Sequence, residues 1–248
     1  MYASWPQGLA ILLQADYKPT HNSLKATINS QCAESLNLFH STGLCSVSRD
    51  EIELSAASPI LSQVIIKFLV SERKHIQSLA ETYLPSDQLT QLALKPGSLF
   101  GGYQAFHACE MLKTRDIDVK WAMCYPWLMY SSVEDIELAE VLWNAGFRDV
   151  DEVREDGLTT LMQRERGSRN LNSLRFSNWL VRKGADLYRE SPSGIPALHY
   201  LAYGIGRSEL YDAEMVQKNL RDPEILQLLE TILLDPFRTL RNTLVHAL

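Results

Sequence analysis

The sequence predicts an all-α fold, part of which is built from short helical repeats. The helix start signals are explicit, because 58–59, 222–223 and 235–236 each place Ser or Asp directly before proline at the first helical position. No run of alternating apolar and polar residues persists long enough to predict a strand. Similar phrases also recur at 156–162 and 193–199, as expected of a repeat architecture.

The two recurring phrases read DGLTTLM at 156–162 and SGIPALH at 193–199. Their glycines, Gly157 and Gly194, are 37 residues apart. Each phrase follows a predicted helix end by a similar interval, because Gly146 precedes Gly157 by eleven residues and Gly184 precedes Gly194 by ten. The interval between the phrases therefore defines one helix-containing repeat.

These phrases resemble the D-G-x-T-P-L-H motif of ankyrin repeats, whose period is about 33 residues. Pro196-Ala197 stands in place of Thr-Pro, and Met162 replaces the motif histidine. The resemblance covers residues 5–43 and 133–204, and the order of the pieces is similar to that of large ankyrin proteins of filamentous fungi. It implies a structural role for the matching residues: Gly146, Gly157, Thr160, Leu161, Gly184, Gly194, Leu198 and His199. For His199 it implies hydrogen bonds to backbone that tie neighbouring loops together.

The repeat also has a local physical rationale. Gly184 follows an apolar helix, where a residue with positive φ is commonly needed to end it. Thr160 and Gln163 have the spacing of a capping box for the next helix. The excess over 33 residues lies in 164–171, between two helices, where an insertion costs little.

Four segments are expected along the chain: degenerate N-terminal repeats at 1–43, an irregular helical region at 44–130, repeats at 131–206 and a helical C-terminal cap at 207–248. The second segment is either a helical insertion or a set of drifted repeats. In the first two segments, helices are expected at 23–28, 33–40, 59–83, 86–94 and 103–112. Two further residues are candidates for helix N-caps: Ser86, and Ser131 with Glu134 three residues later. A polar stretch at 71–75 predicts a solvated turn in the long helix.

Composition narrows the class of protein. The chain has 248 residues, of which 46% are hydrophobic, so a packed core is expected and wholesale disorder is not. The net charge of −6 argues against non-specific nucleic-acid binding. No apolar run approaches the roughly 20 residues of a membrane span, and the N-terminus lacks the basic start of a signal peptide. We therefore expect a monomer in the cytoplasm or nucleus, with its four cysteines reduced.

No motif points to catalysis. The sequence contains neither a phosphate-binding glycine loop nor a G-x-S-x-G elbow. His40 with Cys45, and His107 with Cys109, are conceivable metal ligands, but zinc sites normally show tighter, paired spacing. We therefore expect no catalytic residue, no metal and no cofactor.

The strongest charge pattern lies around the first phrase. Residues 134–156 carry nine acidic residues and two arginines, whereas 164–183 carry six basic residues and one glutamate. Either these charges solvate helix faces and loops, or the acidic loop steers a basic partner surface. On the second interpretation, exposed loop residues bind the partner: Asp151, Glu152, Arg154, Glu155, Tyr188, Arg189 and Glu190.

The function expected from the resemblance is binding of another protein through loop tips and the concave face of a helical solenoid. The alternative is a regulatory or structural segment of a larger protein, with no binding activity of its own. A third class, nucleic-acid binding through 164–182, is not favoured by the net charge. The identity of the partner is not encoded in any recognisable motif.

Overall fold

The computed structural model describes residues 6–15, 17, 20–42, 47–92, 95–117, 119, 127–131, 133, 135–167, 171–209, 223, 226, 227 and 230. At residues 21, 40–42, 165–167, 171 and 204–209 only the backbone is described. The chain divides into two compact units, residues 1–149 and 150–248. This division falls inside the segment 131–206 that the sequence suggested as one block.

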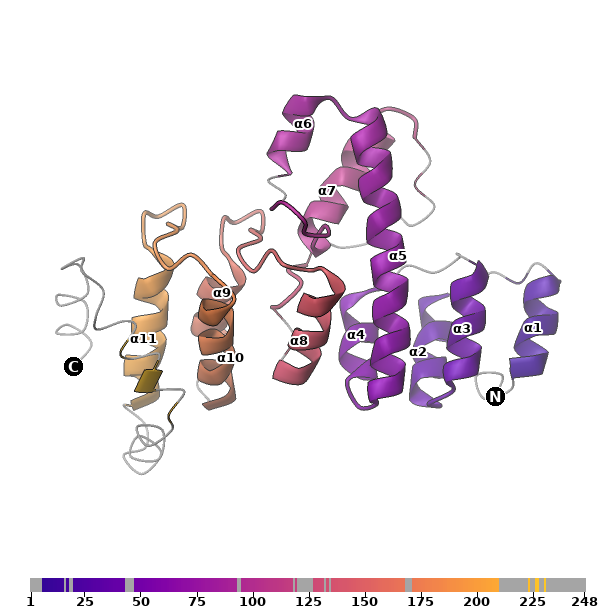
Figure 1. Cartoon of the computed structure of the whole chain (residues 1–248), viewed down its shortest axis with the longest axis horizontal. Coiled ribbons are helices and arrows are strands. Elements are labelled where there is room, and N and C mark those ends of the chain that lie inside the picture. The colour runs from indigo at the N-terminus through magenta and orange to yellow at the C-terminus, as the bar shows by residue number, and fades with distance from the viewer. Residues whose placement is uncertain are drawn as a thin grey trace. The chain divides into compact units, whose positions relative to one another are not determined.

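The described residues form helices and no strand, which confirms the all-α prediction (Figure 1). Two isolated antiparallel bridges are the only β pairing among them. The helices are α1 (Pro6–Gln14), α2 (His21–Asn29), α3 (Ala33–Thr42), α4 (Arg49–Ser55), α5 (Pro59–Tyr83), α6 (Ser86–Gln91), α7 (Gly102–Lys113), α8 (Ile136–Ala145), α9 (Thr160–Gly167), α10 (Leu171–Arg182) and α11 (Ala197–Glu209).

In the N-terminal unit, antiparallel helix pairs stack side by side. α2 packs against α3 and α4 against α5, while α2 also contacts α4 and α3 also contacts α5 (Figure 1). α1 continues the row of α3. The pairing has a simple cause, because each short helix buries only one apolar face and needs neighbours to cover it.

Helix α4 is absent from the sequence-based expectations, although its signal is present. Ser48 is the N-cap residue, and its amide donates to the Glu51 carboxylate three residues later at 2.8 Å. Such a capping box marks a helix start. Because α4 and α5 stack on α2 and α3, the helical pairing continues into the segment 44–130.

α5 is a single continuous helix, and Ser58 occupies its N-cap position directly before Pro59, as predicted. The expected solvated turn at 71–75 is wrong in its centre. Glu72 and Arg73 are buried, with an Nη1–Oε1 distance of 3.0 Å between them, and the Val47 amide donates to Glu72 Oε2 at 3.2 Å. Helices α3, α4, α7 and α8 all pack on α5. Glu72 and Arg73 are therefore enclosed, whereas the other three residues of 71–75 are exposed.

At two other helices the observed N-cap lies one or more positions away from the predicted one. Pro85, not Ser86, occupies the N-cap of α6. α8 begins after Asp135, whose carboxylate accepts a hydrogen bond from the Glu137 amide at 2.8 Å, so Ser131 is not its cap. Aspartate is as good a cap as serine, and the nearer candidate starts the helix.

Two cysteines fall in described parts of this unit, and both are free thiols. Cys32 is half-buried, whereas Cys109 is buried in α7. Burial raises the pKa of the Cys109 thiol to about 11, and the charge of Arg73 acts in the opposite direction. Cys109 is thus held as a neutral, inert thiol.

The C-terminal unit contains α9, α10 and α11. α9 packs against both α10 and α11. The core of this unit includes Phe176 and Leu180 from α10, together with Leu201 from α11. Arg164, at the start of the basic region 164–182, is buried with its guanidinium 4.1 Å from the centre of the Phe176 ring.

Several expectations lie outside the described residues. They include the start signal at 235–236 and most of the cap at 207–248, along with Cys45, Cys124 and Glu134. None of the described helices is both long and apolar enough to cross a membrane. The expected cellular location and monomeric state remain predictions.

Candidate functional site

Two loops of the C-terminal unit have the same backbone turn. We call residues 150–159 the first loop and residues 186–196 the second loop. Val153 pairs with Thr159 in one isolated bridge, and Glu190 pairs with Pro196 in the other. Each partner in the second bridge lies 37 residues after its counterpart in the first.

The hydrogen bonds inside the two turns repeat at the same offset. The Arg154 amide donates to Leu158 O at 3.1 Å, and the Ser191 amide donates to Ile195 O at 2.9 Å. The next turn bond runs from Gly157 to Arg154 and from Gly194 to Ser191, at 2.8 Å in both loops.

Both glycines are required by the turn. Gly157 has φ of +71° and Gly194 has φ of +73°, a region that side chains other than glycine rarely adopt. The predicted equivalence of the two phrases is therefore present in the backbone.

The helix ends before the loops also match. Gly146 has φ of +115° and Gly184 has φ of +89°. After each glycine the next amide bonds back to a leucine carbonyl, Phe147 to Leu142 at 3.2 Å and Ala185 to Leu180 at 3.0 Å. This is the hydrogen bond of a helix C-terminus closed by a left-handed residue.

The predicted capping box at Thr160 is wrong by one residue. Thr159 precedes α9, and its hydroxyl accepts a hydrogen bond from the Met162 amide at 3.4 Å. Thr160 is instead the first residue of the helix and is buried. The equivalent residue before α11 is Pro196, which offers a fixed φ but no side-chain acceptor.

The other motif residues serve packing. Leu161 and Leu198 are buried at the starts of α9 and α11. His199 is half-buried, and its amide donates to Pro196 O at 3.0 Å. The loop-tying bonds implied for its side chain remain a prediction.

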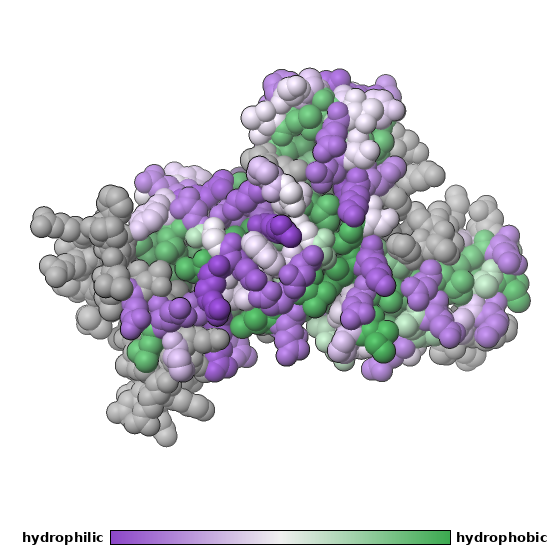
Figure 2. Space-filling model, viewed as in Figure 1, coloured by the Kyte–Doolittle hydropathy of each residue, from purple (hydrophilic) through white to green (hydrophobic). Residues whose placement is uncertain are grey.

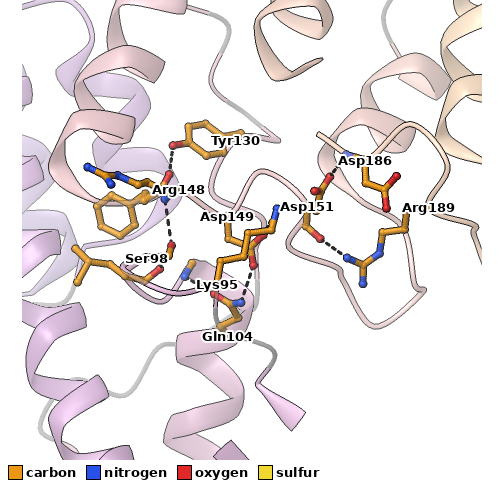
Figure 3. Close-up of polar contacts among 12 residues, drawn as sticks. Lys95, Ser98, Gln104, Tyr130, Arg148, Asp149, Asp151, Asp186 and Arg189 are labelled. Carbon is orange, nitrogen blue, oxygen red and sulfur yellow. Dashed lines mark hydrogen bonds and ion pairs between the residues drawn. The ribbon is translucent and has the colours of Figure 1, made fainter. Parts of the chain in front are cut away.

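The two loops lie against each other. A Cβ added to Gly157 would lie 2.4 Å from Cγ of Pro192, so the first turn approaches the second at van der Waals contact. The Asp186 amide donates to Asp151 Oδ1 at 2.9 Å, and Arg189 Nη1 donates to Asp151 O at 3.2 Å (Figure 3). Asp151 thus joins the two loops by accepting hydrogen bonds from the second one, and we call it the latch residue of the first loop.

This packing corrects part of the predicted binding surface. Asp151 and Glu152 were expected to be exposed, but their exposed fractions are only 5% and 3%. Asp151 is covered because the second loop donates two hydrogen bonds to it, and Glu152, the next residue, is buried as well. Of the other proposed residues, Arg154, Glu155, Tyr188 and Glu190 are exposed and Arg189 is half-buried.

The tips carry mainly hydrophilic side chains, as Figure 2 shows above α9 to α11. Arg154 forms an ion pair with Asp156 in the first loop. Exposed residues alternate with half-buried ones along the second loop, where Asp186, Tyr188 and Glu190 point outward. Asp186 is a member of this surface that the sequence reasoning missed, although it lies two residues before Tyr188.

The N-terminal unit has its own polar cluster at its end (Figure 3). Gln104 donates to Asp149 Oδ2 at 2.9 Å, and Lys95 Nζ lies 3.5 Å from Asp149 Oδ1. The Tyr130 hydroxyl donates to Phe147 O. Because Asp149 is already satisfied, we assign this cluster to stability.

Among the described residues, no three His, Cys, Asp or Glu side chains are grouped so that they could hold a metal ion. The His107 ring packs edge-to-face on Tyr103 in α7, which places it in an aromatic contact. No family model matches the chain, and no curated protein matches it either. Any function must accordingly be argued from the site itself.

Proposed function

We propose that this protein is a degenerate ankyrin-like repeat solenoid that binds another protein through its loop tips and the concave helical face beside them. The observation that carries the proposal is the recurrence of one turn, with the same bonds and the same left-handed glycines, at a 37-residue offset. Stacked repeats of this kind form extended surfaces suited to partner recognition.

The loop tips have the properties of a binding surface. Their backbone is fixed by hydrogen bonds within and between the loops, so little conformational entropy is lost when a partner docks. Their exposed side chains include charged residues and one aromatic, which are groups that give specificity and anchoring. In this proposal α4 and α5 extend the stack that α2 and α3 begin in the N-terminal unit.

Affinity capture from the native source, followed by chemical cross-linking and mass spectrometry, tests the proposal. We expect a stoichiometric protein partner whose cross-links map to residues 154–157 and 186–194. Glu155→Arg with Ser193→Arg should abolish capture, because both residues are exposed at the tips.

Glu110→Arg with Thr114→Arg is the matched control, since both residues are exposed around the end of α7 in the other unit. The control should leave capture unchanged. Equal loss in both variants, or catalytic turnover of a small molecule by the purified chain, would contradict the proposal.

A further inference from the structure

We propose that the outward side of the second loop, formed by Asp186, Tyr188 and Glu190 and here called the Tyr188 face, docks a Lys- or Arg-bearing segment of the partner protein. This inference rests on the proposed function and names the chemistry of the partner. It replaces the acidic surface expected from the sequence, because two of that surface's carboxylates are buried.

The central observation is an exposed aromatic ring on a fixed backbone. Tyr188 is 50% exposed. Its amide donates to Asp186 Oδ1 at 2.9 Å. The carbonyls on either side of it, those of Leu187 and Arg189, accept hydrogen bonds from the first two amides of α11 at 2.8 and 2.9 Å. The ring is therefore presented from a pre-formed loop.

The equivalent positions of the two loops differ in residue type and in exposure. Tyr188 is 37 residues after Asp151, the latch residue that receives the Asp186 amide. A tyrosine has no carboxylate with which to accept such a bond. The second loop thus carries an exposed aromatic where the first loop carries a buried latch.

The charges around the ring select the partner. Asp186 and Glu190 are exposed on either side of Tyr188. The neighbouring cation, Arg189, turns back to bond Asp151 O at 3.2 Å. A basic side chain can pair with the two carboxylates and lie over the tyrosine ring in a cation–π contact. An acidic segment would meet like charge on both sides.

The test measures fluorescence anisotropy of a labelled twelve-residue peptide of alternating Arg and Ser, with an alternating Glu and Ser peptide for comparison, at low ionic strength. The full chain should bind the Arg peptide and not the Glu peptide. Tyr188→Ala should weaken binding about threefold, and Tyr188→Phe should retain it, because cation–π contacts at exposed sites are worth about 0.5–1 kcal/mol.

The paired change Asp186→Asn with Glu190→Gln should weaken binding about fivefold, as expected for two exposed ion pairs. Its matched control is Glu81→Gln with Asp87→Asn, two exposed carboxylates at the end of α5 and in α6. The control removes the same charge and should change affinity less than about twofold. Thermal melts of each variant should match that of the unmodified chain.

Equal weakening by the two paired changes would mean attraction to net charge alone and would overturn the inference, as would full affinity in Tyr188→Ala. If a captured partner cross-links to the loop tips while these peptide results fail, the inference falls and the proposed function stands. If no partner is captured at all, both fall.

Discussion

The two loops of the C-terminal unit have the same backbone but different surroundings. The second loop contacts the first at Asp151, and both Asp151 and Glu152 are buried. The equivalent residues of the second loop, Tyr188 and Arg189, are exposed and half-buried. One turn geometry therefore serves two purposes, stacking in the first loop and presentation to solvent in the second.

The difference lies in neighbours rather than in local conformation. Gly157 and Gly194 have nearly the same φ, yet an added Cβ would strike Pro192 in one case and meet nothing within 4 Å in the other. A substitution at equivalent positions should hence have unequal costs. Three such comparisons, and a fourth between two loop arginines that differ in burial, test this view from the largest expected effect to the smallest.

The largest effect is expected from alanine at the turn glycines. Gly194→Ala should cost about 1 kcal/mol, because a residue with a side chain is strained at positive φ. Gly157→Ala should cost about 3 kcal/mol, because overlap with Pro192 adds to the same strain. Urea denaturation gives both free energies of unfolding.

Adding Pro192→Ala should recover part of the extra loss in Gly157→Ala, since it removes the struck atoms. Equal costs at the two glycines would mean that the loops do not touch.

The next comparison concerns the latch position. Asp151→Ala should lower the free energy of unfolding by about 2 kcal/mol, because a buried acceptor is removed and the Asp186 amide loses its partner. Tyr188→Ala, at the equivalent exposed position, should change it by less than about 0.5 kcal/mol. Thermal melts followed by circular dichroism measure the difference.

Asp151→Asn keeps an oxygen acceptor and is the conservative control. If it were as destabilising as Asp151→Ala, the hydrogen bond would not be the source of the loss.

A smaller effect is expected at the helix starts. Thr159→Ala should cost about 1 kcal/mol through loss of the cap on the Met162 amide. Pro196→Ala should cost about 0.5 kcal/mol, because proline acts there by restricting the unfolded chain. Hydrogen exchange at the first turn of α9 and of α11 separates the two, and faster exchange in α9 is expected only for the threonine change.

The last comparison concerns the two loop arginines, and it tests mainly how the loss of stability depends on salt. Arg154→Ala removes an exposed ion pair with Asp156 and should cost at most about 0.5 kcal/mol, falling with added salt. Arg189→Ala should cost about 1 kcal/mol with little salt dependence, because its bond to Asp151 O is partly buried. Identical salt dependence in the two variants would contradict the distinction.

Much of the fold was predictable from local signals. The Ser58-Pro59 start, the long helix after it and the equivalence of Gly157 with Gly194 all follow from residue types and spacing. α4 was equally visible in the Ser48 and Glu51 box, although it was overlooked. The predicted positions of other helix caps were wrong by one or more residues. Thr159 and Thr160 have the same side chain, so only the backbone conformation decides which of them is the cap.

The exposure of the loop residues was predictable only in part. Charge and loop position placed Glu155, Tyr188 and Glu190 correctly at the surface. The same reasoning failed for Asp151, because burial of a carboxylate depends on which amide faces it across a distance of 35 residues. The polar centre of α5 failed for the same reason, since neighbouring helices enclose Glu72 and Arg73.

The sequence by itself determined the all-α class, the 37-residue interval between the two matching turns and the positions that need glycine, because helix propensity, capping and positive φ are properties of a residue and its near neighbours. Only the tertiary structure decided which loop carboxylates are buried and which face outward. Their burial depends on the packing of one loop on another, which brings together atoms that are distant along the chain. This packing sets the free-energy cost of burying each charged group between the loops.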